Sequence, residues 1–258
     1  MYELIDTHAH LDEMKDLDEA IERARVCGLS GIVAMGVDYE SNNRVLEIAE
    51  RYKSIVFPAL GCHPGDLPEE NEEIERNLRF IEDNIGRAVA VGEIGLDYHK
   101  KIVGRTSKDM QKQVFRQALE IAVRYGKPVS VHSRYAWRDC LTCVQESQVE
   151  RAVFHWYTGP VNVLREFIGG GYLASATLAV EYHEEHRRAI RETPFDRLML
   201  ETDSPVPYRL GETRHNAEPA DVTNVVVDSV AQLKNVGPDV VAERTTANAR
   251  AFFGIQSD

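Results

Sequence analysis

The sequence predicts an α/β fold of the (β/α)₈ TIM-barrel class, in a single domain over residues 1–258. Short apolar, β-branched segments alternate with longer amphipathic ones, and eight such units fit into the 258 residues. This alternation is typical of parallel strands joined by right-handed helical crossovers, and the chain length suits a closed barrel. An open doubly wound sheet is the alternative. It lacks its main support, because no G-x-G-x-x-G motif follows the first strand.

Each expected element follows from the local pattern of apolar residues. The expected strands are Glu3–Asp6, Gly31–Gly36, Ile55–Leu60, Ala88–Gly92, Pro128–Val131, Ala152–Phe154, Tyr172–Ala174 and Arg197–Leu200. The segments between them carry apolar residues at helical spacing. The expected helices are Leu17–Cys27, Glu40–Lys53, Asn71–Asn84, Lys108–Tyr125, Trp137–Gln145, Val161–Ile168, Glu184–Arg191, Pro219–Leu233 and Pro238–Phe253.

Glycines and long loops mark the boundaries between these elements. Gly28 and Gly126 each stand where an expected helix stops before a strand. No Gly-, Ser- or Pro-rich linker divides the chain. The longest irregular segments are Leu96–Ser107 and Pro205–Pro219. Long loops in a compact domain are often functional.

Composition limits the possible partners. The formal net charge is −12, with 43% hydrophobic and 28% charged residues. Such an acidic chain does not coat duplex DNA through a broad basic patch, so nucleic acid would be held locally, by metal ions and a few basic side chains. The first residues lack a secretory pattern, and no stretch reaches the roughly 18 apolar residues of a membrane span. We expect a cytoplasmic protein without membrane contact.

The four cysteines are expected to be plain thiols. They are Cys27, Cys62, Cys140 and Cys143. Cys140 and Cys143 form a lone C-x-x-C in a helical segment, whereas a zinc ribbon needs a second pair. A disulfide scaffold is not expected in a chain of this length without a secretory signal.

Titratable residues follow six of the eight expected strands, where a barrel places its active site. They are His8 and His10, His63, Glu93 and Asp97, His132, His155, and Glu201 and Asp203. Of the nine histidines, five therefore lie at expected strand ends. The other four occupy loops or polar helical stretches and are expected to be solvated: His99, His183, His186 and His215.

His8 and His10 predict a metal site. Residues two apart on a strand point to the same face, so both imidazoles can bind one ion. A lone His-x-His pattern is not specific. Together with two more histidines and the carboxylates of Glu93 and Asp203, however, it supplies ligands for two divalent ions. The residue types allow Mg, Mn or Zn, among other metals, and do not identify which.

Two bound ions would lower the pKa of a shared water and generate hydroxide at neutral pH. They would also hold a phosphoryl or carbonyl oxygen of the substrate. A nearby carboxylate must accept the second proton of the water. Asp203 is the candidate, because the eighth strand lies beside the first in a closed barrel.

At this point the motifs resemble those of the TatD family of metal-dependent deoxyribonucleases, which belongs to the amidohydrolase-like barrels. The resemblance runs from residue 2 to about residue 253 and rests on five motifs. These are His8-Ala9-His10, Gly61-Cys62-His63-Pro64, Gly92-Glu93-Ile94-Gly95-Leu96-Asp97-Tyr98, His132-Ser133-Arg134 and Glu201-Thr202-Asp203-Ser204-Pro205.

The resemblance implies a role for each matching residue. One ion would be held by His8, His10, Glu93 and Asp203, and the other by Glu93, His132 and His155, with Glu93 bridging. His63 and Arg134 would contact the scissile phosphate, and Glu201 would orient neighbouring ligands. Related barrels use a modified lysine as the bridge, so a glutamate at that place favours the TatD branch.

The chain departs from the family pattern in two places. After His155 the family commonly has Cys-Phe, whereas this chain has Trp156 and Tyr157. These rings are expected either to stack on a base or sugar of the substrate or to form a packed aromatic rim. The second departure is the loop Arg209–Pro219, which is longer than the family's and carries acidic residues. It affects the expected substrate more than the expected metal site.

The resulting functional hypothesis is a divalent-metal-dependent deoxyribonuclease that acts on single strands or on DNA ends. A metal-dependent hydrolase of another ester or amide bond, such as aminoacyl-tRNA deacylation, is the first alternative, because the same ions polarise a carbonyl group. A non-catalytic metal-binding protein is the second. The sequence leaves the oligomeric state open.

Overall fold

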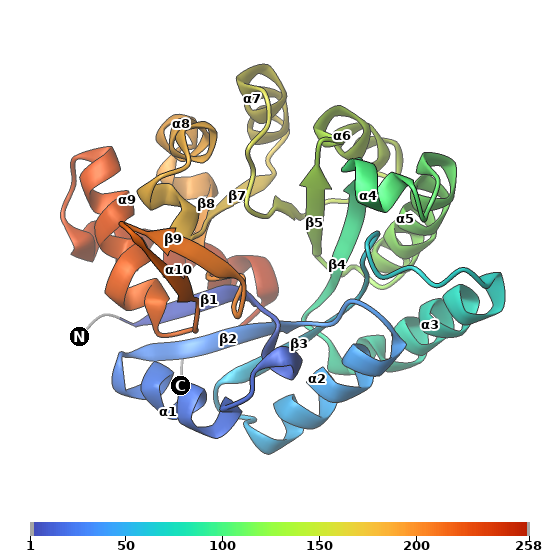
Figure 1. The fold of residues 1–258 in the computed structure, drawn as a ribbon, viewed down its shortest axis with the longest axis horizontal. Helices are drawn as coiled ribbons and strands as arrows, with labels where there is room; N and C mark the ends of the chain where they lie inside the picture. The colour runs from blue at the N-terminus through green and yellow to red at the C-terminus, as the bar shows by residue number, and fades with distance from the viewer. Residues whose placement is uncertain (1–2, 257–258) are drawn as a thin grey trace.

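The computed structural model describes residues 3–256 and contains one eight-stranded parallel sheet in the order β1 to β8 (Figure 1). The strands are β1 (Leu4–Ala9), β2 (Leu29–Met35), β3 (Val56–Cys62), β4 (Ala90–Asp97), β5 (Val129–Arg134), β6 (Ala152–Phe154), β7 (Leu173–Ala176) and β8 (Leu198–Leu200). The segment after β8 returns to β1, where Asp203 N donates to His8 O at 2.8 Å and Ala9 pairs with Ser204. The sheet is therefore a nearly closed barrel, as predicted.

Helices surround the barrel. They are α1 (Leu17–Val26), α2 (Tyr39–Arg51), α3 (Asn71–Asn84), α4 (Lys100–Val103), α5 (Lys108–Arg124), α6 (Trp137–Glu146), α7 (Val161–Gly169), α8 (Glu184–Glu192), α9 (Val227–Lys234) and α10 (Pro238–Phe253). Local capping fixes several helix starts. The Asp38 side chain accepts from Ser41 N before α2, and Ser107 accepts from Met110 N before α5.

Five strands, β1, β3, β4, β5 and β7, end later than the sequence predicts. β1, β4 and β5 continue to Ala9, Asp97 and Arg134, so His8, Glu93, His132 and Arg134 stand inside strands rather than after them. The reason is that the ladder between β4 and β5 persists to the pair Asp97 and Arg134. Regular backbone therefore holds these functional side chains.

The segment after β8 is not the irregular loop that the sequence suggests. It contains a hairpin of β9 (Pro207–Leu210) and β10 (Thr213–Asn216), with a turn at Gly211, whose φ is +61°. The expected helix Pro219–Leu233 begins late, as a π-helical turn over Val222–Val226 that leads into α9.

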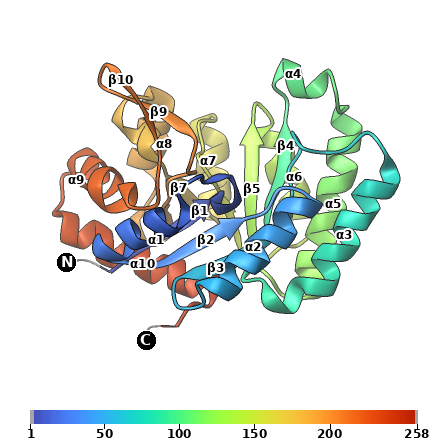
Figure 2. The same ribbon diagram turned by 60° about the horizontal axis from the view of Figure 1, so that its bottom comes forward.

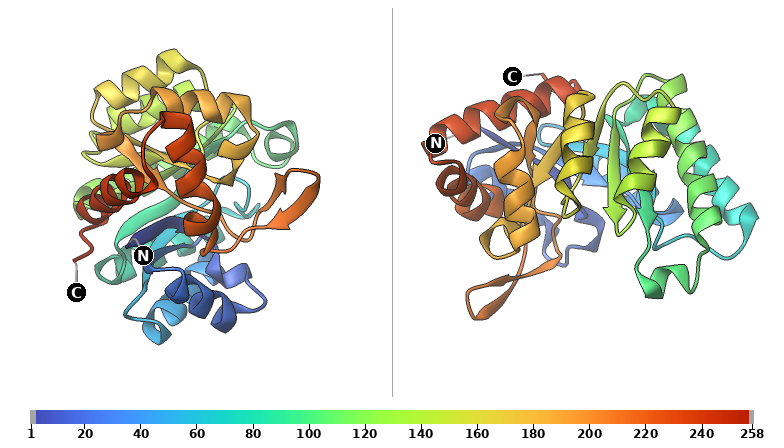
Figure 3. Two further views of the ribbon diagram at one scale, coloured as in Figure 1. Left: turned by 90° about the vertical axis from the view of Figure 1, so that its left-hand side faces the viewer. Right: turned by 90° about the horizontal axis from the view of Figure 1, so that it is seen from above.

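The core lies inside the barrel and between the barrel and its helices. At the N-terminal end of the strands, α10 packs against β8 and β1. There Phe252 and Phe253 join a cluster with Met35, Val153 and Met199 of the strands, which closes this end with apolar side chains. The C-terminal ends of the strands are left for polar residues. The hairpin and α4 both extend beyond that end, on opposite sides of it (Figures 2 and 3).

None of the helices within residues 3–256 combines the length and the apolar composition needed to cross a membrane. The four cysteines are free, as expected.

Candidate metal centre

The structure brings the six expected metal ligands together at the C-terminal mouth of the barrel. They come from five places around it, namely β1, β4, β5, the residue after β6 and the segment after β8: His8 and His10, Glu93, His132, His155, and Asp203. All except His132 are buried. Burial of charged groups is costly unless they are paired or bind a cation.

Four of these side chains form the first half of the centre. His8 Nε2 lies 3.3 Å from His10 Nε2, 3.4 Å from Glu93 Oε2 and 3.5 Å from Asp203 Oδ1. His10 Nε2 lies 3.4 Å from the same Glu93 oxygen and 3.3 Å from the same Asp203 oxygen. Two nitrogens and two oxygens therefore face one another across a common point.

The other oxygen of Glu93 faces the second half. Glu93 Oε1 lies 2.7 Å from His132 Nδ1 and 2.8 Å from His155 Nε2. The two nitrogens are 3.4 Å apart. Glu93 thus directs one carboxylate oxygen to each group of histidines.

The spacing of the first group fits a bound ion. Ligand atoms about 2.0–2.1 Å from a tetrahedral ion lie about 3.3–3.4 Å from one another. Five separations among these atoms, from 3.3 to 3.5 Å, match that edge length. A hydrogen-bonded cluster would instead show shorter donor–acceptor distances. The residues present fit a divalent cation.

The electrostatics of the centre also favour added positive charge. Burial alone would raise the pKa of Glu93, but the surrounding histidines, His155 foremost, hold it well below its ordinary value. Burial likewise opposes ionisation of Asp203, and His10 together with its neighbours outweighs it and lowers the pKa. Both carboxyl groups are therefore charged at neutral pH and available as ligands.

The histidines respond to the same carboxylates. Burial would lower the pKa of His10, yet Asp203 and Glu93 raise it well above its ordinary value. His8 behaves differently, because burial and the neighbouring His155 lower its pKa. Its ring stacks on His155, with centroids 4.1 Å apart and planes 12° from parallel. Two stacked imidazoles are best accommodated when at least one is neutral, as a metal ligand must be.

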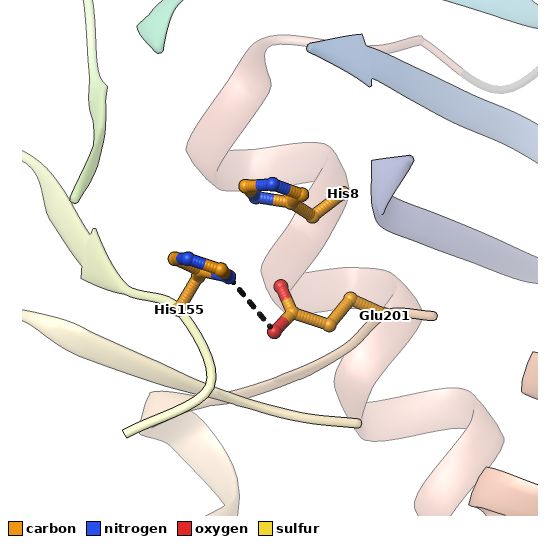
Figure 4. Close-up of side chains that lie close together, drawn as sticks. All are labelled: His8, His155 and Glu201. Atoms are coloured by element: carbon orange, nitrogen blue, oxygen red, sulfur yellow. Dashed lines mark ion pairs between the residues drawn. The ribbon is translucent and has the colours of Figure 1, made fainter. Parts of the chain in front are cut away.

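Neighbouring polar groups set the direction of each imidazole. Ser130 Oγ lies 3.3 Å from His8 Nδ1 and leaves Nε2 facing the centre. Glu201 Oε1 lies 3.5 Å from His155 Nδ1, and Figure 4 shows this carboxylate facing the His155 ring with His8 stacked above. At this position the Glu201 carboxylate can accept a hydrogen bond from His155 Nδ1. Such partners fix the orientation and tautomer of metal-binding histidines.

Close backbone contact brings the ligand-bearing strands together. A Cβ at Gly95 would overlap the carbonyl oxygen of His132 on β5, and a Cβ at Gly61 would overlap the backbone of Glu93 on β4. Glycine is therefore required at both positions. Asp203 adopts a left-handed φ of +53° while its N–H is tied to His8 O, which is the kind of strain that active sites retain.

Two of the expected substrate contacts lie beside the centre. His63 Nδ1 pairs with Asp66 Oδ2 at 2.6 Å, so Nε2 points inward, 3.9 Å from Glu93 Oε1. The guanidinium of Arg134 binds Asp97 Oδ2 at 2.6 and 2.9 Å while 49% of the side chain stays exposed. Each keeps donor capacity toward the mouth.

The two aromatic residues after β6 are placed differently from each other. Trp156 is half-buried, its backbone N–H donates to Glu201 Oε1 at 2.9 Å, and its ring contacts Tyr208 at 5.1 Å between centroids. Tyr157 is fully buried and its hydroxyl donates to Pro160 O. The expectation that Tyr157 contacts substrate is therefore wrong in this structure, because its ring packs in the core.

His186 is also buried rather than solvated. Its Nε2 accepts from Thr177 N at 3.1 Å, and its Nδ1 lies 3.0 Å from Tyr157 O. In α8 it shares its buried face with Ala189 and Ile190, three and four residues on. That helical spacing was the signal in the sequence, hidden because the rest of the helix is charged.

Three further residues support the centre: Asp97, which the sequence already places at a strand end, and Ser130 and Asp6, which it does not single out. Asp97 lies 3.4 Å from His132 Nε2, and Ser130 contacts His8. Asp6 accepts from Thr202 N and Oγ1 at 3.0 and 2.6 Å, which ties β1 to the segment that carries Asp203. Ser130 and Asp6 each belong to the same strand as a predicted ligand, and that proximity was the available clue.

The protein is a parallel barrel with a buried cluster of histidines and carboxylates at its mouth. These two features are typical of the metal-dependent barrel hydrolases. The chain belongs to the family described as TatD related DNase, whose model matches residues 5–254.

Similar proteins and solved structures agree with this family. Deoxyribonuclease TATDN3 of Homo sapiens is 31% identical over 97% of this chain and 94% of its own length. The uncharacterized metal-dependent hydrolase YabD of Bacillus subtilis is 34% identical over 98% of this chain and 99% of its own. YJJV, a TatD homologue from Escherichia coli K12, has a TM-score of 0.88 at 27% identity, with 98% of each chain covered. The chain is a metal-dependent hydrolase acting on ester bonds, and it binds divalent metal.

Proposed function

We propose that this hydrolase cleaves phosphodiester bonds in DNA, from an end or in single strands, with two divalent ions. His8, His10, Glu93 and Asp203 would hold one ion. His132, His155 and again Glu93 would hold the other. The proposal rests on the orientation of the Glu93 carboxylate. Its Oε2 faces His8 and His10, and its Oε1 faces His132 and His155.

The family and its relatives support DNA as the substrate. The matching family is described as TatD related DNase, and the human relative TATDN3 is named a deoxyribonuclease. The position of the centre supports an end or a single strand. Its ligands are mostly buried within the barrel mouth, where a flexible single strand reaches more easily than a rigid duplex. The net charge of −12 also argues against broad duplex binding.

When bound, the two ions supply a water of lowered pKa and offset the negative charge of the phosphate in the transition state. The chain then provides the rest. Asp203, ionised and beside His8 and His10, accepts the second proton of the attacking water. His63 Nε2 and the exposed part of Arg134 bind the phosphate oxygens. Trp156, half-buried at the rim, contacts the substrate beside them.

The test uses Glu93→Gln, which keeps the side-chain shape but removes one of the two anionic oxygens. Labelled single-stranded and blunt duplex DNA are incubated with wild type and variant in Mg²⁺, Mn²⁺ or Zn²⁺, and bound metal is counted by elemental analysis. We expect the variant to lose at least about 100-fold in rate and to bind less metal. Glu72→Gln, on the exposed face of α3, is the matched control and retains both.

The outcomes separate the alternatives. Release of mononucleotides from single strands or ends supports the proposal. Failure to cleave DNA with any of the metals, combined with turnover of carboxyl esters or aminoacyl-tRNA, would replace phosphodiester cleavage by hydrolysis of another ester. Wild-type DNA cleavage that survives Glu93→Gln contradicts the bridging role.

A further inference from the structure

An exposed tyrosine stands at the mouth of the barrel in a conformation that tyrosine rarely adopts. Tyr135 follows the last residue of β5, has a φ of +57° and is 59% exposed. Left-handed backbone costs free energy for a residue with a bulky side chain, so it persists where the surroundings impose it, often at functional sites. Among the described residues, Gln148, Trp156, Asp203 and Asn235 also have a positive φ, and two of these, Trp156 and Asp203, lie at the mouth of the barrel beside the metal centre.

The ring of Tyr135 is backed by other rings. His99 stacks on it, with centroids 6.2 Å apart and planes 26° from parallel, and Trp137 meets it edge-on at 5.8 Å. The two segments that carry Tyr135 and His99 are joined, because Tyr98 N donates to Arg134 O at 2.8 Å. Within its own segment, His99 N donates to Asp97 Oδ1 at 2.8 Å. One face of the tyrosine is thus supported, while much of its surface is open to solvent.

The segment beside Tyr135 is basic in an otherwise acidic chain. Residues 98–108 contain Lys100, Lys101, Arg105 and Lys108 and no acidic residue, although the whole chain has a net charge of −12. Lys100 and Lys101 are exposed on α4, and neither forms an ion pair within residues 3–256. Proteins bind single-stranded nucleic acid with two kinds of side chain: cations that contact the phosphates and aromatic rings that stack on the bases. This surface offers both.

This surface is connected directly to the metal centre. Tyr135 follows Arg134, whose guanidinium holds Asp97 Oδ2, and that oxygen lies 3.4 Å from His132 Nε2. Figures 2 and 3 show α4 beyond the C-terminal ends of β4 and β5, on the side of the barrel where the site opens. A strand whose phosphate reaches Arg134 therefore passes Tyr135 and α4 next.

We infer that Tyr135, backed by His99, stacks on a nucleobase adjacent to the scissile phosphate, while Lys100 and Lys101 bind the phosphates beyond it. The inference rests on the proposed function and specifies its substrate as an unpaired strand with an accessible base face. It also moves the expected aromatic contact from Tyr157, which is buried, to Tyr135.

Binding to the metal-loaded protein tests the stacking contact. The probe is a single-stranded oligonucleotide with phosphorothioate linkages, which resist cleavage, and with 2-aminopurine at successive positions from its end. We expect its fluorescence to be quenched at one position by wild type and by Tyr135→Trp, and not by Tyr135→Ala. The alanine variant should also bind about ten-fold more weakly, since base–aromatic stacking contributes about that much.

A matched pair of controls sits at the opposite end of the barrel. Tyr125 is 45% exposed and precedes β5, so Tyr125→Ala should leave binding and quenching unchanged. For the cations, Lys100→Gln with Lys101→Gln should reduce the slope of log Kd against log salt concentration by about 1.4, whereas Lys53→Gln before β3 should not. An abasic nucleotide at the quenched position should abolish the difference between wild type and Tyr135→Ala.

The results distinguish this inference from the proposed function. If wild type cleaves DNA but Tyr135→Ala binds and is quenched as wild type is, the stacking contact is overturned and the proposed function stands. If wild type neither binds nor cleaves DNA with any divalent metal, both are overturned.

Discussion

His186 should make the stability of this protein depend on pH below neutrality. Its surroundings hold it neutral: Thr177 N can only donate, so Nε2 must accept, and Tyr157 O can only accept, so Nδ1 carries the hydrogen. Burial lowers the pKa of His186 from 6.5 to about 4. In the unfolded chain the same imidazole binds a proton at an ordinary pKa.

The size of the effect follows from the two pKa values. Between pH 6.5 and 4 the unfolded chain binds more protons at this residue than the folded one, so stability falls as the pH falls. The contribution is fully present above pH 6.5 and is lost toward pH 4. The total is about 3 kcal/mol, of which about 2 kcal/mol is lost between pH 7.5 and 5.

The assay is reversible urea unfolding at pH 7.5 and 5, with EDTA throughout so that metal release does not contribute. We expect His186→Gln to be less stable at pH 7.5 by about 1–3 kcal/mol, because a hydrogen bond to buried backbone is lost. Its loss of stability on going to pH 5 should be about 2 kcal/mol smaller than that of wild type. If wild type and variant lose stability in parallel, His186 is not held neutral and the argument fails.

Three further outcomes follow from the centre and the strands that carry it. Glu201→Gln should weaken metal binding about 10–100-fold, measured by calorimetry, since the carboxylate beside His155 Nδ1 is neutralised; unchanged affinity argues against an orienting role. Removing metal with EDTA should lower Tm by roughly 8–16 °C if the ions are present at about 1,000 times their Kd, and an unchanged Tm would mean that folding and metal binding are not linked. Gly95→Ala should lower the urea midpoint severely, because its Cβ overlaps His132 O, whereas Gly86→Ala, where a Cβ meets nothing within 4 Å, should not.

Much of the site could be predicted because it depends on order along the chain. Parallel strands place their C-terminal ends at one end of the barrel. A titratable residue that follows an apolar strand therefore lies at the mouth, whatever the details of packing. His8, Glu93, His132 and Asp203 were predicted in this way, and the structure brings them together. That His8 and His10 point to the same side could be predicted from the two-residue period of a strand alone.

Burial of single side chains could not be predicted in the same way. His186 and Tyr157 lie in segments where polar neighbours or an aromatic pair conceal the packed face, and only the approach of α8 to the segment after β6 buries them together. The loop after β8 has no apolar periodicity, so its folding into a hairpin depends on pairing across Gly211 rather than on a pattern.

The sequence by itself determined the barrel class and the residues that meet at its mouth, because both follow from the periodicity and order of the chain. Only the tertiary structure decided how the two oxygens of Glu93 are divided between two groups of histidines, and which aromatic ring is exposed beside them. Those features depend on distances of a few tenths of an ångström and on contacts between distant segments, which local propensity does not encode. For the same reason, Tyr135 rather than Tyr157 faces solvent at the mouth.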